Sequence, residues 1–177
     1  MTGRARPAKA DPVGSGDARL ASMFADDRIT AIGLIIEAVG GLNAKLATQY
    51  AEHGLAPAEF EVLVRIARTR GQSLRMSDLA AQTLLTTSGI TRVVDRLERD
   101  GLVDRRPCPT DRRGSLAAIT PEGLKRLDAV LPGHLELVDK WFTSLLSPEE
   151  LDSLLQSLRI VRDAVRPEAT AGADAEL

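Results

Sequence analysis

The chain has 177 residues, of which 44% are hydrophobic, and its formal net charge is −2. This balance suits one folded domain with its own core and excludes a protein that coats nucleic acid with a basic surface throughout. One cysteine, Cys108, and two histidines, His53 and His134, are too few for a disulfide framework or a Cys/His metal site within one chain, so we expect no metal and no cofactor.

Both ends of the sequence are rich in small and polar residues. We predict disordered tails at residues 1–17 and 167–177 and a single structured domain over residues 18–166. The N-terminal stretch lacks the apolar core of a signal peptide, and the most hydrophobic run, IGLIIEAVGGL, contains Glu37 and is too short to cross a bilayer. These features predict a cytoplasmic protein that does not bind membranes.

The first predicted elements are two helices and a short strand. Apolar residues recur at steps of three, four and seven along residues 18–52, which is typical of a helix with one buried stripe. Gly54 ends that helix, and Pro57 begins the next. We expect the second helix to bury Phe60, Leu63, Val64 and Ala67. Residues 74–76 suit a short strand, and a third helix begins near Ser77.

The fourth predicted helix has a polar front and an apolar back. Thr86 or Thr87 suits its N-cap, and Gly101 ends it. The side chains expected in the core are Ile90, Val93, Val94 and Leu97. The side chains left on the outer side are Thr87, Ser88, Thr91, Arg92 and Asp95. A short helix, a turn and a second helix of this kind match a helix-turn-helix, whose second helix enters the major groove of DNA.

A basic hairpin follows. Its predicted arms are residues 102–107 and 116–119, around turn-forming residues 109–114. Residues 105–113 hold four Arg against one Asp, whereas residues 147–177 hold seven acidic residues against three Arg. Positive charge is therefore concentrated at the hairpin, which would lie as a wing beside the helix-turn-helix. Together the polar helix and the wing predict binding to double-stranded DNA.

Two leucine-rich helices complete the prediction. Thr120 is the N-cap of the first, and Pro121 is its first residue. Pro132 lies inside this helix, and because the leucine stripe stays in register across it, we expect a kink rather than two helices. Ser147 and Glu150 form a capping box for the last helix.

The apolar stripes at both ends of the domain need a partner surface. We predict that the helices over residues 18–52 and 121–166 form a homodimer interface, while residues 57–120 bind DNA. A two-fold dimer would present two recognition helices about one DNA turn apart, roughly 34 Å, which matches a palindromic operator.

Particular side chains are expected to contact DNA. On the fourth helix they are Thr86, Thr87, Ser88, Thr91 and Arg92. Hydroxyl groups can reach phosphates or bases, and Arg can bind guanine through two hydrogen bonds. On the wing, Arg112 or Arg113 would enter the minor groove, and Asp111 would pair with an Arg and fix the shape of the loop. The alternative interpretation is that the helix face and the wing loop are ordinary polar surfaces that contact only solvent.

Three other features have competing interpretations. Glu61 and Arg65, one turn apart, could line a ligand pocket or form a surface ion pair. Cys108 lies near Arg105, Arg106 and Arg112, and nearby cations can make a thiol oxidisable, so a redox-sensing regulator is the alternative, while an ordinary strand thiol is the preferred interpretation. No catalytic pairing or phosphate loop stands out, so we expect no enzyme. A winged helix can also bind protein instead of DNA.

Two segments make the sequence resemble a known family. They are SGITRVVDRLERDGLVDR and DRRGSLAAITPEG, and they resemble the MarR family of winged-helix transcriptional regulators from about Ile32 to Val165. The resemblance implies a mainly α-helical winged helix-turn-helix with a two-stranded β wing and dimerisation helices at both ends. It also implies an obligate homodimer, usually a repressor, that a small phenolic or anionic ligand releases from DNA. By family position, Arg113 is the groove contact and Asp111 its structural partner, with Arg112 as the alternative.

Overall fold

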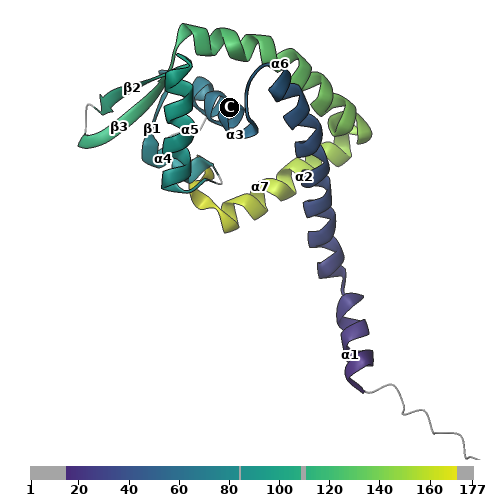
Figure 1. The fold of residues 1–177 in the computed structure, drawn as a ribbon. Coiled ribbons are helices and arrows are strands. Elements are labelled where there is room, and N and C mark those ends of the chain that lie inside the picture. The colour runs from purple at the N-terminus through teal and green to yellow at the C-terminus, as the bar shows by residue number, and fades with distance from the viewer. Residues whose placement is uncertain (1–14, 84, 109–110, 171–177) are drawn as a thin grey trace, which may run out of the picture. The chain divides into compact units, whose positions relative to one another are not determined.

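The computed structural model describes residues 15–83, 85–108 and 111–170 (Figure 1). The chain divides into two compact units, Met1–Gly41 and Leu42–Leu177, which are described separately. The single domain expected over residues 18–166 stays a prediction.

The two predicted tails fall mostly outside the described residues. Of the first tail, residues 15–17 belong to a helix, and of the second, residues 167–170 form a 3-10 helix. The prediction of disorder is therefore wrong for these two short parts. The 3-10 helix at residues 167–170 is held against the second unit because the side chain of Ala169 is buried.

The first unit contains α1 (Ser15–Phe24) and the first part of α2 (Asp27–Glu52). The sequence predicted one continuous helix here, and that prediction is wrong. The Asp26 carboxylate accepts hydrogen bonds from the backbone N–H of Arg28 at 2.9 Å and from its guanidinium at 2.6 and 2.8 Å. Asp is a preferred residue at helix starts, so Asp26 ends one helix and begins another. The same hydrogen bonds lower the pKa of Asp26.

Large apolar side chains of this unit are exposed in the single chain. They are Leu20, Met23, Phe24, Ile29, Ile32, Leu34, Ile35, Ile36 and Val39. By length and composition alone, α2 is able to cross a membrane, contrary to the expectation that its apolar run is too short. An exposed apolar helix suits a protein interface equally well.

The second unit holds the remaining elements and a small antiparallel sheet. After the end of α2 they are α3 (Pro57–Arg68), β1 (Ser73–Arg75), α4 (Met76–Gln82), α5 (Thr87–Arg99), β2 (Val103–Cys108), β3 (Asp111–Ile119), α6 (Pro121–Trp141), the 3-10 helix η1 (Thr143–Leu145), α7 (Pro148–Val165) and the 3-10 helix η2 (Pro167–Thr170). The strand order is β1-β3-β2. The wing therefore gains a third strand, β1, which pairs Ser73 with Ala118 and Leu74 with Ala117. The side chain of Leu74 holds this strand in place because it is buried in the core.

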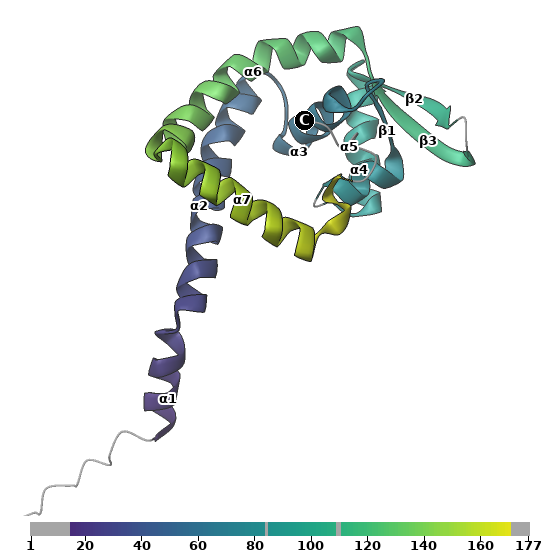
Figure 2. The same ribbon diagram turned by 180° about the vertical axis from the view of Figure 1, so that it is seen from behind.

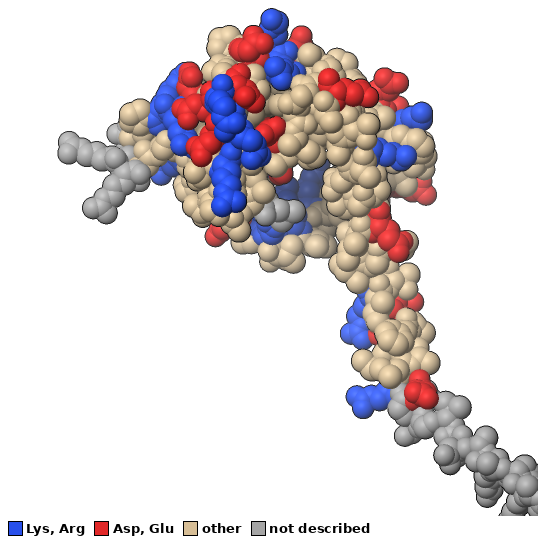
Figure 3. All heavy atoms as spheres, viewed as in Figure 1, with Lys and Arg blue, Asp and Glu red and all other residues tan. Residues whose placement is uncertain are grey.

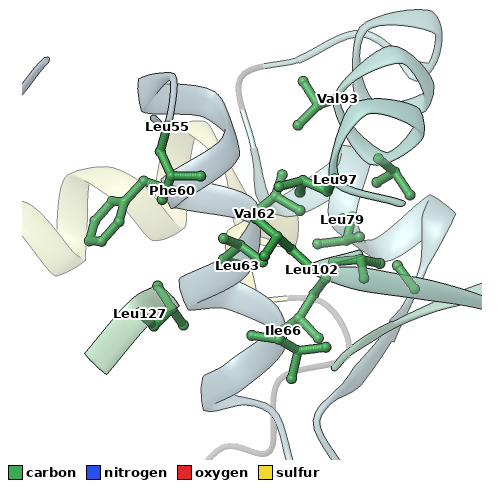
Figure 4. Close-up of a cluster of buried hydrophobic side chains, with 14 of the residues drawn as sticks. Leu55, Phe60, Val62, Leu63, Ile66, Leu79, Val93, Leu97, Leu102 and Leu127 are labelled. Carbon is green, nitrogen blue, oxygen red and sulfur yellow. The ribbon is translucent and has the colours of Figure 1, made fainter. Parts of the chain in front are cut away.

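The core of this unit surrounds α3 (Figure 4). Phe60 and Leu63 are buried as predicted, but Val64 and Ala67 are only half-buried. Val62 and Ile66, which the helical stripe did not include, have no exposed surface. The reason is that α3 contacts α4, α5, α6 and the sheet, so its buried face is wider than a stripe against one partner.

The start of α6 packs against the turn between α5 and β2. The Thr120 hydroxyl accepts a hydrogen bond from the Gly123 N–H at 3.0 Å, which confirms the predicted N-cap, and donates to the Gly101 carbonyl at 2.7 Å. A Cβ atom on Gly123 would lie 2.2 Å from the Leu102 carbonyl oxygen. Only glycine fits this contact, which fixes α6 beside the end of α5.

The two last long helices begin where predicted, but α6 ends at Trp141 and residues Thr143–Leu145 form the separate 3-10 helix η1. Helix α6 continues through Pro132 as one helix, and Ser147 and Glu150 form the predicted capping box at the start of α7. Several apolar side chains of these helices and of η1 between them are exposed in the single chain, namely Leu135, Leu145, Leu154, Leu158, Ile160, Val161 and Val165.

Candidate nucleic-acid interface

The front of α5 is a group of exposed hydroxyls at a helix N-terminus. Thr86 is the N-cap, and its side-chain oxygen accepts a hydrogen bond from the Gly89 N–H at 3.1 Å. Thr87 and Ser88 are exposed beside it, and the Ser88 hydroxyl lies 3.1 Å from that of Thr86. A helix N-terminus carries partial positive charge and unpaired N–H groups, so this end of α5 is suited to a phosphate.

The next turn of α5 separates core from surface as predicted. The buried side chains are Ile90, Val93, Val94 and Leu97. Thr91 and Arg92 are exposed, and the Thr91 hydroxyl donates to the Thr87 carbonyl at 2.9 Å. Thr91 can therefore offer an incoming ligand a methyl group and acceptor lone pairs. No described side chain forms an ion pair with Arg92, which leaves its guanidinium available to a ligand.

The wing is a paired hairpin beside α5. Strands β2 and β3 pair from Val103 opposite Ile119 to Pro107 opposite Ser115, with an irregularity at Pro107 and Cys108. The backbone of Asp111, Arg112 and Arg113 belongs to β3, but their side chains lie outside the described part of the structure. Their predicted contacts with DNA and with each other stay predictions.

Arg105 on β2 connects the wing to α5, and sequence reasoning missed this role. Its Nη2 lies 2.5 Å from Asp95 Oδ1 and donates to the Thr91 carbonyl at 3.3 Å, while its Nε lies 3.8 Å from Glu98 Oε2. The Arg105 N–H also donates to Glu98 at 3.3 Å. Arg105 thus neutralises two carboxylates on the recognition face and holds the hairpin against α5.

Acidic and basic side chains alternate over this end of the second unit. Figure 3 shows Lys and Arg beside Asp and Glu over α5 and the hairpin. The exposed residues that contribute are Arg92, Asp95, Glu98, Arg99, Asp104 and Arg106. The carboxylates of Asp95 and Glu98 would repel phosphates, and their pairing with Arg105 reduces this repulsion.

A second ion pair, between the buried carboxylate of Glu59 and the partly exposed Arg96, ties α3 to α5. Glu59 is buried, and its Oε1 accepts a hydrogen bond from Arg96 Nε at 2.6 Å while its Oε2 accepts one from the Ala56 N–H at 2.8 Å. The only cue in the sequence is the Glu three residues after the helix start, which indicates a cap but not its partner on α5.

Cys108 and the candidate ligand residues have ordinary structural surroundings. Cys108 ends β2 with a buried side chain, which limits access of an oxidant. Glu61 and Arg65 form an i,i+4 ion pair at 3.2 Å, and Arg65 Nη1 also donates to the Ala169 carbonyl at 3.2 Å. The structure therefore brings these two residues together, while ligand binding by them stays a prediction.

The histidines take part in packing and helix contacts. Tyr50 stacks on Phe60 with ring centroids 4.2 Å apart, and its hydroxyl lies 2.9 Å from His134 Nδ1. Burial lowers the pKa of His134 and raises the pKa of Tyr50 to about 12. The His53 carbonyl accepts a hydrogen bond from Arg126. Within the described ranges, no three His, Cys, Asp or Glu side chains are grouped to hold a metal ion.

Comparison with known proteins decides the family. A model of the MarR family matches residues 53–114, from just before α3 into the wing. The HTH-type transcriptional regulator MhqR of Bacillus subtilis is 34% identical over 128 residues, which cover 72% of this chain and 86% of MhqR. The chain belongs to the MarR family.

Two further MarR relatives bear on function. The HTH-type transcriptional repressor YetL of Bacillus subtilis is 31% identical over 117 residues, covering 66% of this chain and 70% of YetL. Sco3205, a MarR family transcriptional regulator from Streptomyces coelicolor solved in complex with DNA, is 33% identical with a TM-score of 0.74, and the match covers 84% of this chain and 91% of Sco3205. The chain is thus a DNA-binding transcriptional regulator with a winged helix-turn-helix, in which α4 and α5 are the two helices and β2–β3 the wing.

Proposed function

We propose that this MarR protein is a cytoplasmic repressor that binds a palindromic operator as a homodimer and is released by a small anionic or phenolic effector. The observation that carries the proposal is the exposed front of α5 beside the wing. Hydroxyls of Thr86, Thr87 and Ser88 would bind phosphates, and Thr91 and Arg92 would reach base edges.

The wing would add a second contact outside the major groove. Arg113 would enter the narrow minor groove, with Arg112 as the alternative, and Asp111 would set the conformation of the loop. Arg105 would hold this hairpin at a fixed position relative to α5 through Asp95 and Glu98.

The homodimer is supported by apolar side chains that a single chain leaves in water. Leu154 and Leu158 on α7 are 37% and 41% exposed, and Ile32 and Ile36 on α2 are exposed further. Contiguous exposed apolar surface marks interaction sites, and a closed two-fold dimer would bury it on both copies.

Repression and release complete the proposal. YetL is named as a repressor, and a dimer bound across promoter DNA blocks transcription by occupancy. We place the effector beside Glu61 and Arg65, because a half-exposed guanidinium can bind an anion. An anion there would compete with the Ala169 carbonyl for Arg65.

The test uses the full chain and DNA from the region beside its own gene. Footprinting should reveal a protected palindrome, and light scattering should give one dimer per site. Affinity for that duplex should exceed affinity for a random duplex by about 10³ or more and should fall with salt. Equal affinity for both duplexes, or a monomer on a half-site, contradicts the proposal.

A further inference from the structure

The last described residues fold back onto the helix-turn-helix. Arg166 follows α7, and its Nη2 donates to the carbonyls of Ala81 at 2.8 Å and Thr83 at 2.7 Å, at the end of α4. Both ribbon views place the end of α7 beside α4 (Figures 1 and 2). We call residues 166–170 the C-terminal anchor.

The chemistry of this contact is that of a helix C-terminus. The last carbonyls of a helix have no partner within the helix and carry partial negative charge. Gln82 and Thr83 are buried, so water has little access to this end of α4. The Arg166 guanidinium supplies two donors and a positive charge there, as basic side chains do at other helix ends.

The anchor also contacts α3. Ala169 in η2 is 6% exposed, and its carbonyl accepts a hydrogen bond from Arg65 Nη1 at 3.2 Å. Five consecutive residues thus join α7 to the two helices that precede the recognition helix. Helix α6 is attached to this region separately, at Thr120 and Gly123 beside the turn after α5 and along α3, where Leu127 and Val130 are buried in the core.

Two attachments at different points restrain a rigid body more than one. The α6 contacts lie at the start of the long helices, and the anchor adds a second point of attachment at the far end of α7. We propose that the C-terminal anchor is a positioning element that fixes the helix-turn-helix relative to α6 and α7 and thereby sets the spacing of operator half-sites. This inference rests on the proposed binding of a palindromic operator by a homodimer.

The proposal can be tested because a change in the spacing of two half-sites also rotates one half-site around the duplex relative to the other. One extra base pair moves a half-site by about 3.4 Å and turns it by about 35° around the duplex. A firmly held recognition helix cannot follow this change, whereas a helix-turn-helix held at one point can.

The experiment measures the affinity of the full chain for operators with the natural spacing and with one base pair added or removed. Arg166→Ala should reduce the preference for the natural spacing by about tenfold, the factor that one charge-assisted hydrogen bond accounts for. Dimer mass and preference for the half-site sequence should not change. Arg166→Lys, which keeps the charge and a donor, should restore part of the preference.

Two further variants sharpen the result. Arg159→Ala removes the same charge from an exposed position of α7 and should behave as wild type. Ala169→Asp puts a charge at a buried position of η2 and should reduce the preference as Arg166→Ala does. An unchanged preference in both Arg166→Ala and Ala169→Asp overturns the anchor, while the wild-type operator binding stands. A wild type that binds all spacings equally also overturns the anchor, whereas a wild type that does not prefer the operator to a random duplex overturns the proposed function.

Discussion

Replacing Arg105 by Ala tests whether the recognition helix depends on a clamp from the wing. The side chains of Arg105 and Asp95 are 31% and 46% exposed, so their ion pair contributes about 1 kcal/mol or less to the free energy of unfolding. The larger effect should be on DNA. Without Arg105, the carboxylates of Asp95 and Glu98 repel phosphates, and we expect operator affinity to fall about tenfold, or roughly 1 to 2 kcal/mol.

The assay is fluorescence anisotropy with operator DNA at several salt concentrations. Arg106→Ala is the matched control, because Arg106 is on the same strand and pairs only loosely with Asp104 at 3.6 Å. Adding Asp95→Asn to Arg105→Ala should restore most of the lost affinity. If it restores nothing, and the Arg105 substitution instead lowers the salt slope by about one unit, then Arg105 is a phosphate contact and the clamp argument is wrong.

Three further variants, one of them a double substitution, test the contact of α6 with the turn after α5, the dimer interface and the aromatic cluster. Gly123→Ala should lower the free energy of unfolding, measured by chemical denaturation, by about 1 to 3 kcal/mol, because its Cβ would overlap a backbone carbonyl. Gly40→Ala, with open space around it, should not be destabilising. Equal free energies of unfolding for the two variants refute the close contact at Gly123. Glu at both Leu154 and Leu158 should give a monomer in light scattering and abolish operator binding, and a dimer that persists excludes this face from the interface. Burial lowers the pKa of His134, so the unfolded chain binds its proton more readily, and stability should fall as pH drops below about 6.5; His134→Asn should remove this dependence, and a variant that keeps it shows that another group titrates.

Local patterns explain which parts of the fold the sequence predicts. The faces of α5 follow from apolar spacing over four turns, and the caps at Thr86, Thr120 and Ser147 follow from residue type at a helix start. These features depend on neighbours a few residues away. The break at Asp26 is also local, but a continuous apolar stripe on both sides concealed it.

The features that sequence reasoning missed depend on distant partners. A short strand was expected at residues 74–76, but its pairing with β3, with Ser73 opposite Ala118, was not, and the anchor exists because Arg166 meets the end of α4, 83 positions away at Thr83. The Arg105 clamp likewise needs the hairpin to fold beside α5 before its carboxylate partners can be recognised. A single sequence shows the charges but not which pairs become neighbours.

The most direct test of the central claim, that the front of α5 reads operator sequence, is the affinity of Arg92→Ala for operator and random duplexes. Arg92 is exposed and has no ion-pair partner among the described residues, so its loss should not perturb the fold. We expect operator binding to weaken by about 1 to 3 kcal/mol, with random-duplex binding changed less, because a contact to a base edge is lost. Arg99→Ala, at the other end of the same helix, is the control and should leave the ratio of the two affinities unchanged. If Arg92→Ala also leaves that ratio unchanged, α5 does not read sequence through this residue and the assignment of the interface is wrong.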